Sequence, residues 1–283
     1  MRTWGARTLA SGVVLIGLLF LAYLFVVLAP MVRTVGFDAY SYWRIDLAQP
    51  YALSTGHLGA FPYSPVLARA FAFAAGGLTW PTFWWVWTAI LVATAGWLGG
   101  RRWWVAVFAF PPVALELYEG NLNLLIAAAI ALGFRYPATW SFVLLAKVTP
   151  GVGLIWFAIR REWRALGLAL AATGILVAVS LAVDAGLWRQ WIEQQLLTSL
   201  REPTGQAQIA IPLLVRLPVA AALVAWGGLT NRRWTVPLSA ALALPVLWVT
   251  AFSILAAIPA IYRQELEPGP IAAPSPAPGV VVA

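Results

Sequence analysis

The chain has 283 residues, of which 62% are apolar and 10% are charged. Soluble domains carry about a quarter charged residues, so this composition excludes an ordinary soluble protein and indicates a polytopic membrane protein. The net charge of +8 comes from arginines in short clusters between apolar runs, which favours the lipid bilayer as partner and excludes nucleic acid.

An apolar run without a charged side chain covers residues 8–32. At about 1.5 Å per residue it is long enough to cross a bilayer core of roughly 30 Å. Arg2 and Arg7 precede it, and the run exceeds the roughly 7–15 residues of a signal-peptide core. We predict an uncleaved signal anchor with its N-terminus in the cytoplasm.

The following stretch, residues 33–63, is polar and rich in aromatic side chains and is predicted to be an extracytoplasmic loop. Asp38 lies just beyond the span, among aromatic rings that would raise its pKa, so it could accept a proton from a substrate hydroxyl. The alternative is an interfacial polar residue in an aromatic belt. His57 could hold the loop over the site, and the alternative is a solvated loop histidine. The candidates for substrate binding in this loop are Tyr40, Arg44, His57 and Tyr63.

Short apolar segments follow the loop. The charge-free run over 70–100 is interrupted at Gly76-Gly77 and before Pro81, which predicts two short helices. Two full passes would place Arg101-Arg102 outside, against the positive-inside tendency, so either one helix is re-entrant or this cluster is an exception. The next segments are shorter than the roughly 17–25 residues of a full span, which indicates half-helices around an internal cavity. They cover residues 103–118, 120–134 and 137–147.

Polar residues interrupt these apolar segments at two places. Glu119, Gly120, Asn121 and Asn123 precede a helix, where capping explains them, although carboxamides could also bind sugar hydroxyls. Lys147 is the only lysine, and an ammonium in apolar surroundings is costly unless it meets an anion such as a lipid phosphate. The alternative is a snorkelling lysine at a helix end.

The second half of the chain contains further spans and a second polar segment. Residues 160–164 form a basic cluster that is predicted to be cytoplasmic. The second polar segment, residues 184–211, is predicted to be extracytoplasmic and holds Gln206 and Gln208 as binding candidates. Three spans are predicted here, over residues 165–183, 212–230 and 236–261. We expect one domain over residues 1–262 and a disordered Pro/Ala-rich tail over 263–283.

The order of these motifs resembles glycosyltransferase family 87, whose members are membrane enzymes of the GT-C type that use polyprenyl-phosphate sugars, typically polyprenyl-phosphate mannose. The resemblance covers roughly residues 8–260. Two departures are Asn121, where the family usually has Gln, and Val249-Thr250, where it tends to be polar. The motifs that carry the resemblance are Asp38, Tyr63-Ser64-Pro65, Gly120-Asn121-Leu122-Asn123, Lys147 with Pro150, the 160–164 cluster, Gly205-Gln206, Leu214-Val215-Arg216-Leu217 and Pro245-Val246-Leu247-Trp248.

We count eight to ten membrane segments along the chain, and the resemblance implies that they form an all-α, GT-C-like transmembrane bundle with short or broken helices around an external-facing cavity. It also implies transfer of a hexose, expected to be mannose, from a polyprenyl-phosphate donor to a glycan or glycolipid acceptor at the outer face of the plasma membrane. Asp38 would be the catalytic base, Lys147 would face the donor phosphate, and Gly120, Asn121 and Asn123 would shape the cavity.

No metal or cofactor is expected. Cysteine is absent and histidine occurs once, which excludes disulfides and argues against a structural zinc site. The competing hypothesis is a non-catalytic glycolipid transporter or flippase, or an assembly partner of a cell-envelope enzyme.

Overall fold

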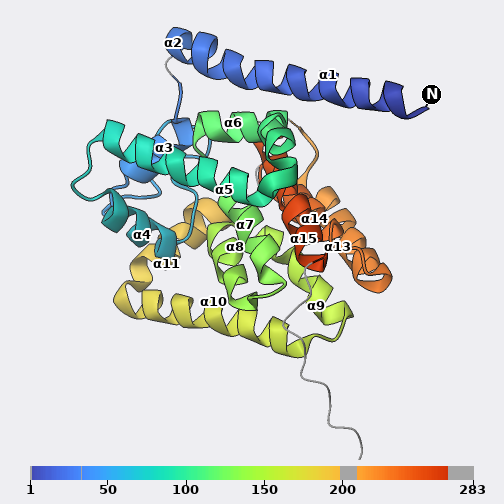
Figure 1. Cartoon of the computed structure of the whole chain (residues 1–283). Coiled ribbons are helices and arrows are strands. Elements are labelled where there is room, and N and C mark those ends of the chain that lie inside the picture. Colours follow the sequence, from blue (N-terminus) through green and yellow to red (C-terminus); the bar gives the residue numbers. More distant parts are fainter. Residues whose placement is uncertain (1, 33, 198–208, 267–283) are drawn as a thin grey trace, which may run out of the picture.

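A computed structural model describes residues 2–32, 34–197 and 209–266 (Figure 1). Every regular element in this described part of the chain is a helix. The prediction of an all-α membrane bundle is therefore confirmed. The predicted site residues Gln206 and Gln208 lie outside the described residues.

The first apolar run forms one long rod made of α1 (Arg2–Tyr23), the π-helical segment η1 (Leu24–Leu28) and α2 (Ala29–Val32). Figure 1 shows it along one side of the molecule, with α10 on the opposite side. Gly17 lets the rod lie close to the backbone of Ala109, since a Cβ at position 17 would lie 1.8 Å from the carbonyl oxygen of Ala109. Most of the rod is not buried, as expected for a helix whose apolar side chains face lipid.

Within the described residues, four helices are long and apolar enough to cross a membrane, or five if one bent pair counts as a span. Besides the first rod, they are α5 (Trp80–Phe108), α10 (Trp163–Val183) and α13 (Leu213–Thr230). The bent pair is α6 (Pro111–Glu119) with α7 (Asn123–Gly133), which meet at 119°. The predicted total of eight to ten segments therefore has to include shorter helices.

The remaining helices are short, as the sequence indicated. Their bounds are α3 (Phe37–Trp43), α4 (Pro65–Ala75), η2 (Pro137–Thr139), α8 (Trp140–Ala146), η3 (Thr149–Leu154), α9 (Ile155–Ile159), α11 (Ala185–Trp191), η4 (Ile192–Leu196), α14 (Thr235–Leu242), η5 (Val249–Ala256) and α15 (Ala257–Leu266). The span predicted over 236–261 is thus broken once, because the chain leaves helical geometry around Pro245, between α14 and η5, whereas η5 continues directly into α15. The tail predicted to begin at residue 263 begins no earlier than 267, because α15 continues to Leu266, and residues 267–283 lie outside the described part.

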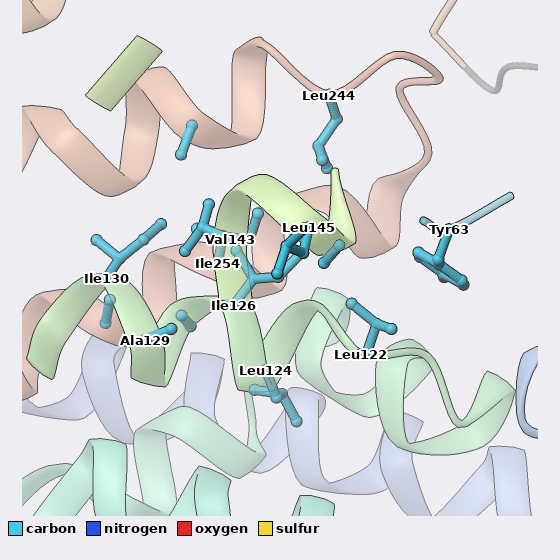
Figure 2. Close-up of a cluster of buried hydrophobic side chains, with 14 of the residues drawn as sticks. Tyr63, Leu122, Leu124, Ile126, Ala129, Ile130, Val143, Leu145, Leu244 and Ile254 are labelled. Atoms are coloured by element: carbon cyan, nitrogen blue, oxygen red, sulfur yellow. The ribbon is translucent and has the colours of Figure 1, made fainter. Parts of the chain in front are cut away.

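The core lies between α7, α8 and η5. Figure 2 shows Ile126 and Ile130 of α7 close to Val143 and Leu145 of α8, with Ile254 of η5 behind them. All five side chains are buried. This packing fixes the start of α7 and the end of α8, from which polar side chains point into the site described below.

The two helices predicted within residues 70–100 have different lengths from those expected. The break at Gly76-Gly77 is present, but α5 continues past Arg101-Arg102, with non-helical geometry at Gly100 (φ 57°, ψ −169°). The segment predicted over 103–118 is accordingly divided between the end of α5 and α6.

Helix α4 is too short to span a bilayer core by itself. Its 11 residues reach about 16 Å, half the thickness of a bilayer core. Arg69 of α4 forms an ion pair with Asp184 at the C-terminal end of α10, at 3.1 Å. Beyond α4, the carbonyl of Leu78 accepts a hydrogen bond from Trp43 Nε1 of α3 at 2.8 Å. Helix α4 thus packs beside α3, α10 and α11, and of the two helices in this region only α5 is long enough to cross a bilayer.

The far end of α5 joins other arginine-rich turns. Arg263 donates to the carbonyl oxygen of Trp97 at 2.8 Å, and Arg233 pairs with Glu265 at 3.5 Å. Arg160 donates to the carbonyl of Gly228 at 3.4 Å. We call this side of the molecule the arginine end; it comprises residues 101–102, 160–164, 232–233 and 263. A single crossing by α5 would place Arg101-Arg102 on the same side as the other basic clusters, so a re-entrant helix before α5 stays a prediction.

Candidate active site

A cavity of about 420 Å³ opens at the end of the molecule opposite the arginine end. Its walls come from α3, the loop over residues 55–63, the α6–α7 bend, the chain after α8, the α11–η4 region and the segment 245–250. The predicted site residues that line it are Asp38, His57, Tyr63, Glu119, Asn121 and Lys147.

Asp38 lies in the first turn of α3. This helix starts after Gly36, which has a positive φ of 78° and donates its amide to the carbonyl of Tyr118 at 2.8 Å. Asn121 Nδ2 donates to Asp38 Oδ2 at 2.6 Å. Burial raises the pKa of Asp38, although the hydrogen bond from Asn121 and the charge of Lys147 act in the opposite direction. The geometry suits a carboxylate that takes up a proton.

Gly120 makes the turn that brings Asn121 to Asp38. It ends α6 with φ 70°, and a Cβ there would lie 2.7 Å from the Cβ of Ala39. Its carbonyl accepts a hydrogen bond from Trp87 Nε1 at 2.6 Å. Gly120 therefore positions the site and is not part of the cavity wall.

Lys147 ends α8 and reaches the cavity from the side of α7. Its Nζ donates to Asn123 Oδ1 at 2.9 Å and lies 5.8 Å from the ring centroid of Tyr63, within the range of a cation–π contact. Burial lowers the pKa of Lys147, while the carboxylates of Glu116 and Asp38 raise it. Asp38 and Lys147 thus open onto one cavity, which is what the sequence hypothesis requires.

Glu116 belongs to this network and was missed in the sequence. Its side chain is fully buried, with both oxygens accepting hydrogen bonds: Oε2 from Asn123 Nδ2 at 3.0 Å, and Oε1 from the amide of Leu124 at 3.2 Å. The signal was available, since a carboxylate inside an apolar segment deserves the same attention as Lys147. Asn123 connects Glu116 to Lys147 and lies behind the cavity wall.

Besides Gly120 and Asn123, two more predicted residues lie outside the cavity wall. Arg44 Nη1 donates to the hydroxyl of Tyr40 at 2.8 Å, and neither side chain lines the cavity. Both follow Asp38 in α3 or directly after it, and the helical turn directs them away from Asp38. His57 does line the cavity, with Nδ1 3.0 Å from the carbonyl oxygen of Ser54.

The second polar segment contributes residues that were not singled out in the sequence. Gln195 and Trp191 line the cavity. Thr55 donates to Gln195 Oε1 at 3.5 Å, which ties the segment to the first loop. Trp248 and Thr250 complete the wall. Within the described residues, no group of three or more His, Asp or Glu side chains could hold a metal ion.

The arrangement combines an acceptor of protons with a cation. Two carboxylates, Asp38 and Glu119, and one ammonium, Lys147, face the same space. Such a site can deprotonate a hydroxyl on one side and stabilise a departing anion on the other.

Comparison with known proteins gives one match. The family model described as Glycosyltransferase family 87 matches residues 51–273, which includes Asn121 and Lys147 but begins after Asp38. No curated protein and no solved structure matches the chain.

Proposed function

The chain belongs to glycosyltransferase family 87, and from this premise we propose that it moves a hexose, mannose in the first instance, from a polyprenyl-phosphate donor to a glycan or glycolipid acceptor. The observation that carries the proposal is that Asp38 and Lys147 line one cavity.

The reaction follows from these two groups. The carboxylate of Asp38 takes the proton from an acceptor hydroxyl, and the hydroxyl oxygen attacks the anomeric carbon of the sugar. The bond between that carbon and the phosphate oxygen breaks, and the electron pair leaves with the polyprenyl phosphate. Lys147 stabilises the negative charge that develops on the phosphate. One displacement inverts the configuration at the anomeric carbon.

The proposal places the cavity on the extracytoplasmic side of the plasma membrane. The arginine end gathers most of the basic clusters, which by the positive-inside tendency belong in the cytoplasm. The loops 33–63 and 184–211 then lie outside, together with the cavity. The apolar surroundings of the site are consistent with a lipid-linked donor that reaches Lys147 from the bilayer.

The test is transfer of labelled mannose from polyprenyl-phosphate mannose by the purified protein. We expect Asp38→Asn to reduce transfer by about 10²–10⁴-fold, the usual contribution of a general base, while binding of polyprenyl phosphate persists. Glu162→Gln, a carboxylate change at the arginine end, is the matched control and should keep full activity. Transfer that survives Asp38→Asn would remove the role of Asp38. A wild-type protein that binds the donor but transfers sugar to no acceptor would favour the glycolipid transporter or assembly partner.

A further inference from the structure

A chain of three polar side chains runs from the interior of the bundle to the cavity. Glu116 on α6 is fully buried and Asn123 on α7 is 1% exposed. Asn123 donates its Nδ2 to Glu116 at 3.0 Å and accepts from Lys147 Nζ at 2.9 Å. Lys147 alone of the three lines the cavity.

Donors and acceptors along these three side chains can be arranged in only one way. A carboxylate accepts only, so the carboxamide must turn its NH₂ group toward Glu116 and its oxygen toward Lys147. The Asn123 oxygen then accepts a hydrogen bond from the lysine nitrogen, and the ammonium is the form that leaves the most N–H donors for the cavity. The α7 N-terminus contributes as well, because the amide of Leu124 binds Glu116 Oε1 and stabilises its negative charge.

We propose that Glu116 is a positioning residue that acts through Asn123 to keep Lys147 charged and directed at the donor phosphate. The inference rests on the proposed function and adds to it a residue that touches neither substrate.

The reaction explains why a second carboxylate is needed. The charged groups that face Lys147 are Glu116 from α6 and Asp38 from α3, and the ring of Tyr63 covers it at 5.8 Å. When Asp38 takes the acceptor proton it becomes neutral, at the moment when the leaving phosphate gains charge. Glu116 is shielded from the cavity and takes no part in that proton transfer, so its link through Asn123 can hold the ammonium in place during the step.

The experiment measures binding of polyprenyl phosphate, and transfer from polyprenyl-phosphate mannose, as a function of pH. Glu116→Gln retains an oxygen for the amide of Leu124 but loses the charge, so the pKa of Lys147 falls further. The alkaline limb of each pH profile, where Lys147 loses its proton, therefore moves to lower pH. Above that limb we expect the affinity for polyprenyl phosphate to fall about tenfold per pH unit, with less than about threefold loss near pH 6. Glu116→Asp, which keeps the charge, should leave the alkaline limb near its wild-type position.

The controls separate this inference from the proposed function. Asn123→Ala removes the link between Glu116 and Lys147 but keeps the Glu116 carboxylate and its hydrogen bond from the amide of Leu124, and it should shift the alkaline limb in the same direction. Glu162→Gln should shift nothing. An alkaline limb and a donor affinity unchanged in both Glu116→Gln and Asn123→Ala would overturn the inference. Absence of transfer by the wild type would instead contradict the proposed function, since the binding measurement does not depend on turnover.

Discussion

Asp38 and Lys147 respond to burial in opposite ways. Burial raises the pKa of the carboxyl and lowers that of the ammonium, because a low-dielectric site disfavours both charged forms. The proposed mechanism needs both charges at once. The active window therefore lies between the two pKa values and is narrower than for the same groups in water.

The pH profile of kcat/KM tests this directly. Activity requires ionised Asp38, so it should be lost as pH falls through a pKa above the ordinary aspartate value of about 3.9. It also requires protonated Lys147, so it should be lost as pH rises through a pKa below the ordinary lysine value of about 10.4. Two limbs at the ordinary values would contradict the burial of these groups.

Replacement of Lys147 tests its role toward the phosphate. Lys147→Met keeps much of the side-chain length and removes the charge, so affinity for polyprenyl phosphate and kcat/KM should both fall, the latter by about 10²-fold or more. Binding can be followed by titration with polyprenyl phosphate. Unchanged affinity would limit Lys147 to packing against Tyr63.

At the scale of elements, the bend between α6 and α7 controls the site. Gly120 has positive φ and lies against Ala39 of α3. We expect Gly120→Ala to cost about 1–3 kcal/mol of stability through backbone strain and the collision, and to lower transfer because Asp38 and Asn121 are pushed apart. Thermal unfolding and transfer activity measure the two effects. Gly167→Ala, on α10 with open space around it, is the control and should be neutral or stabilising. Equal behaviour of the two variants would show that the bend tolerates a side chain.

The side chain of Arg216 holds the segment 245–250 against the cavity. The buried guanidinium of Arg216 on α13 donates to the carbonyl oxygens of Ile211, Leu242, Leu244 and Pro245. Pro245 itself lines the cavity.

Arg216→Met leaves several of these carbonyls without a partner, so we expect a loss of about 2–4 kcal/mol in stability and a higher KM for the donor. Thermal unfolding in detergent and initial rates check both quantities. Arg189→Met, at an exposed arginine of α11, is the control. A variant at residue 216 as stable as the wild type would show that water replaces the guanidinium.

For the whole molecule, the orientation in the membrane can be tested with single cysteines. The natural sequence lacks cysteine, so single cysteines report their own accessibility. Ala48→Cys at the cavity end should react with a membrane-impermeant thiol reagent in intact cells, and Arg101→Cys should react only after permeabilisation. Both positions are exposed on the protein surface, so a difference in labelling between intact and permeabilised cells reports the side of the membrane. The opposite pattern would place the cavity in the cytoplasm.

Much of the fold could be predicted from local sequence. Apolar composition and the charge-free run over 8–32 determine a helical membrane protein, because hydrocarbon requires every backbone group to be paired within the segment. The lone Lys147 and the position of Asp38 after the first span marked both groups of the proposed reaction. The order of the motifs was sufficient to indicate family 87.

The tertiary structure decided which distant residues meet. Asp38 and Asn121 are 83 positions apart, and their contact depends on the turn at Gly120 rather than on any local pattern. The same holds for Glu116 and Lys147, which become partners only because α6, α7 and α8 converge. Hydropathy along the chain tells how a segment meets lipid, but the direction of a side chain within the bundle depends on packing between helices. For that reason the sequence alone identified the charged groups, and only the packed structure showed that Arg44 lies outside the cavity and that Glu116 is connected to Lys147 through Asn123.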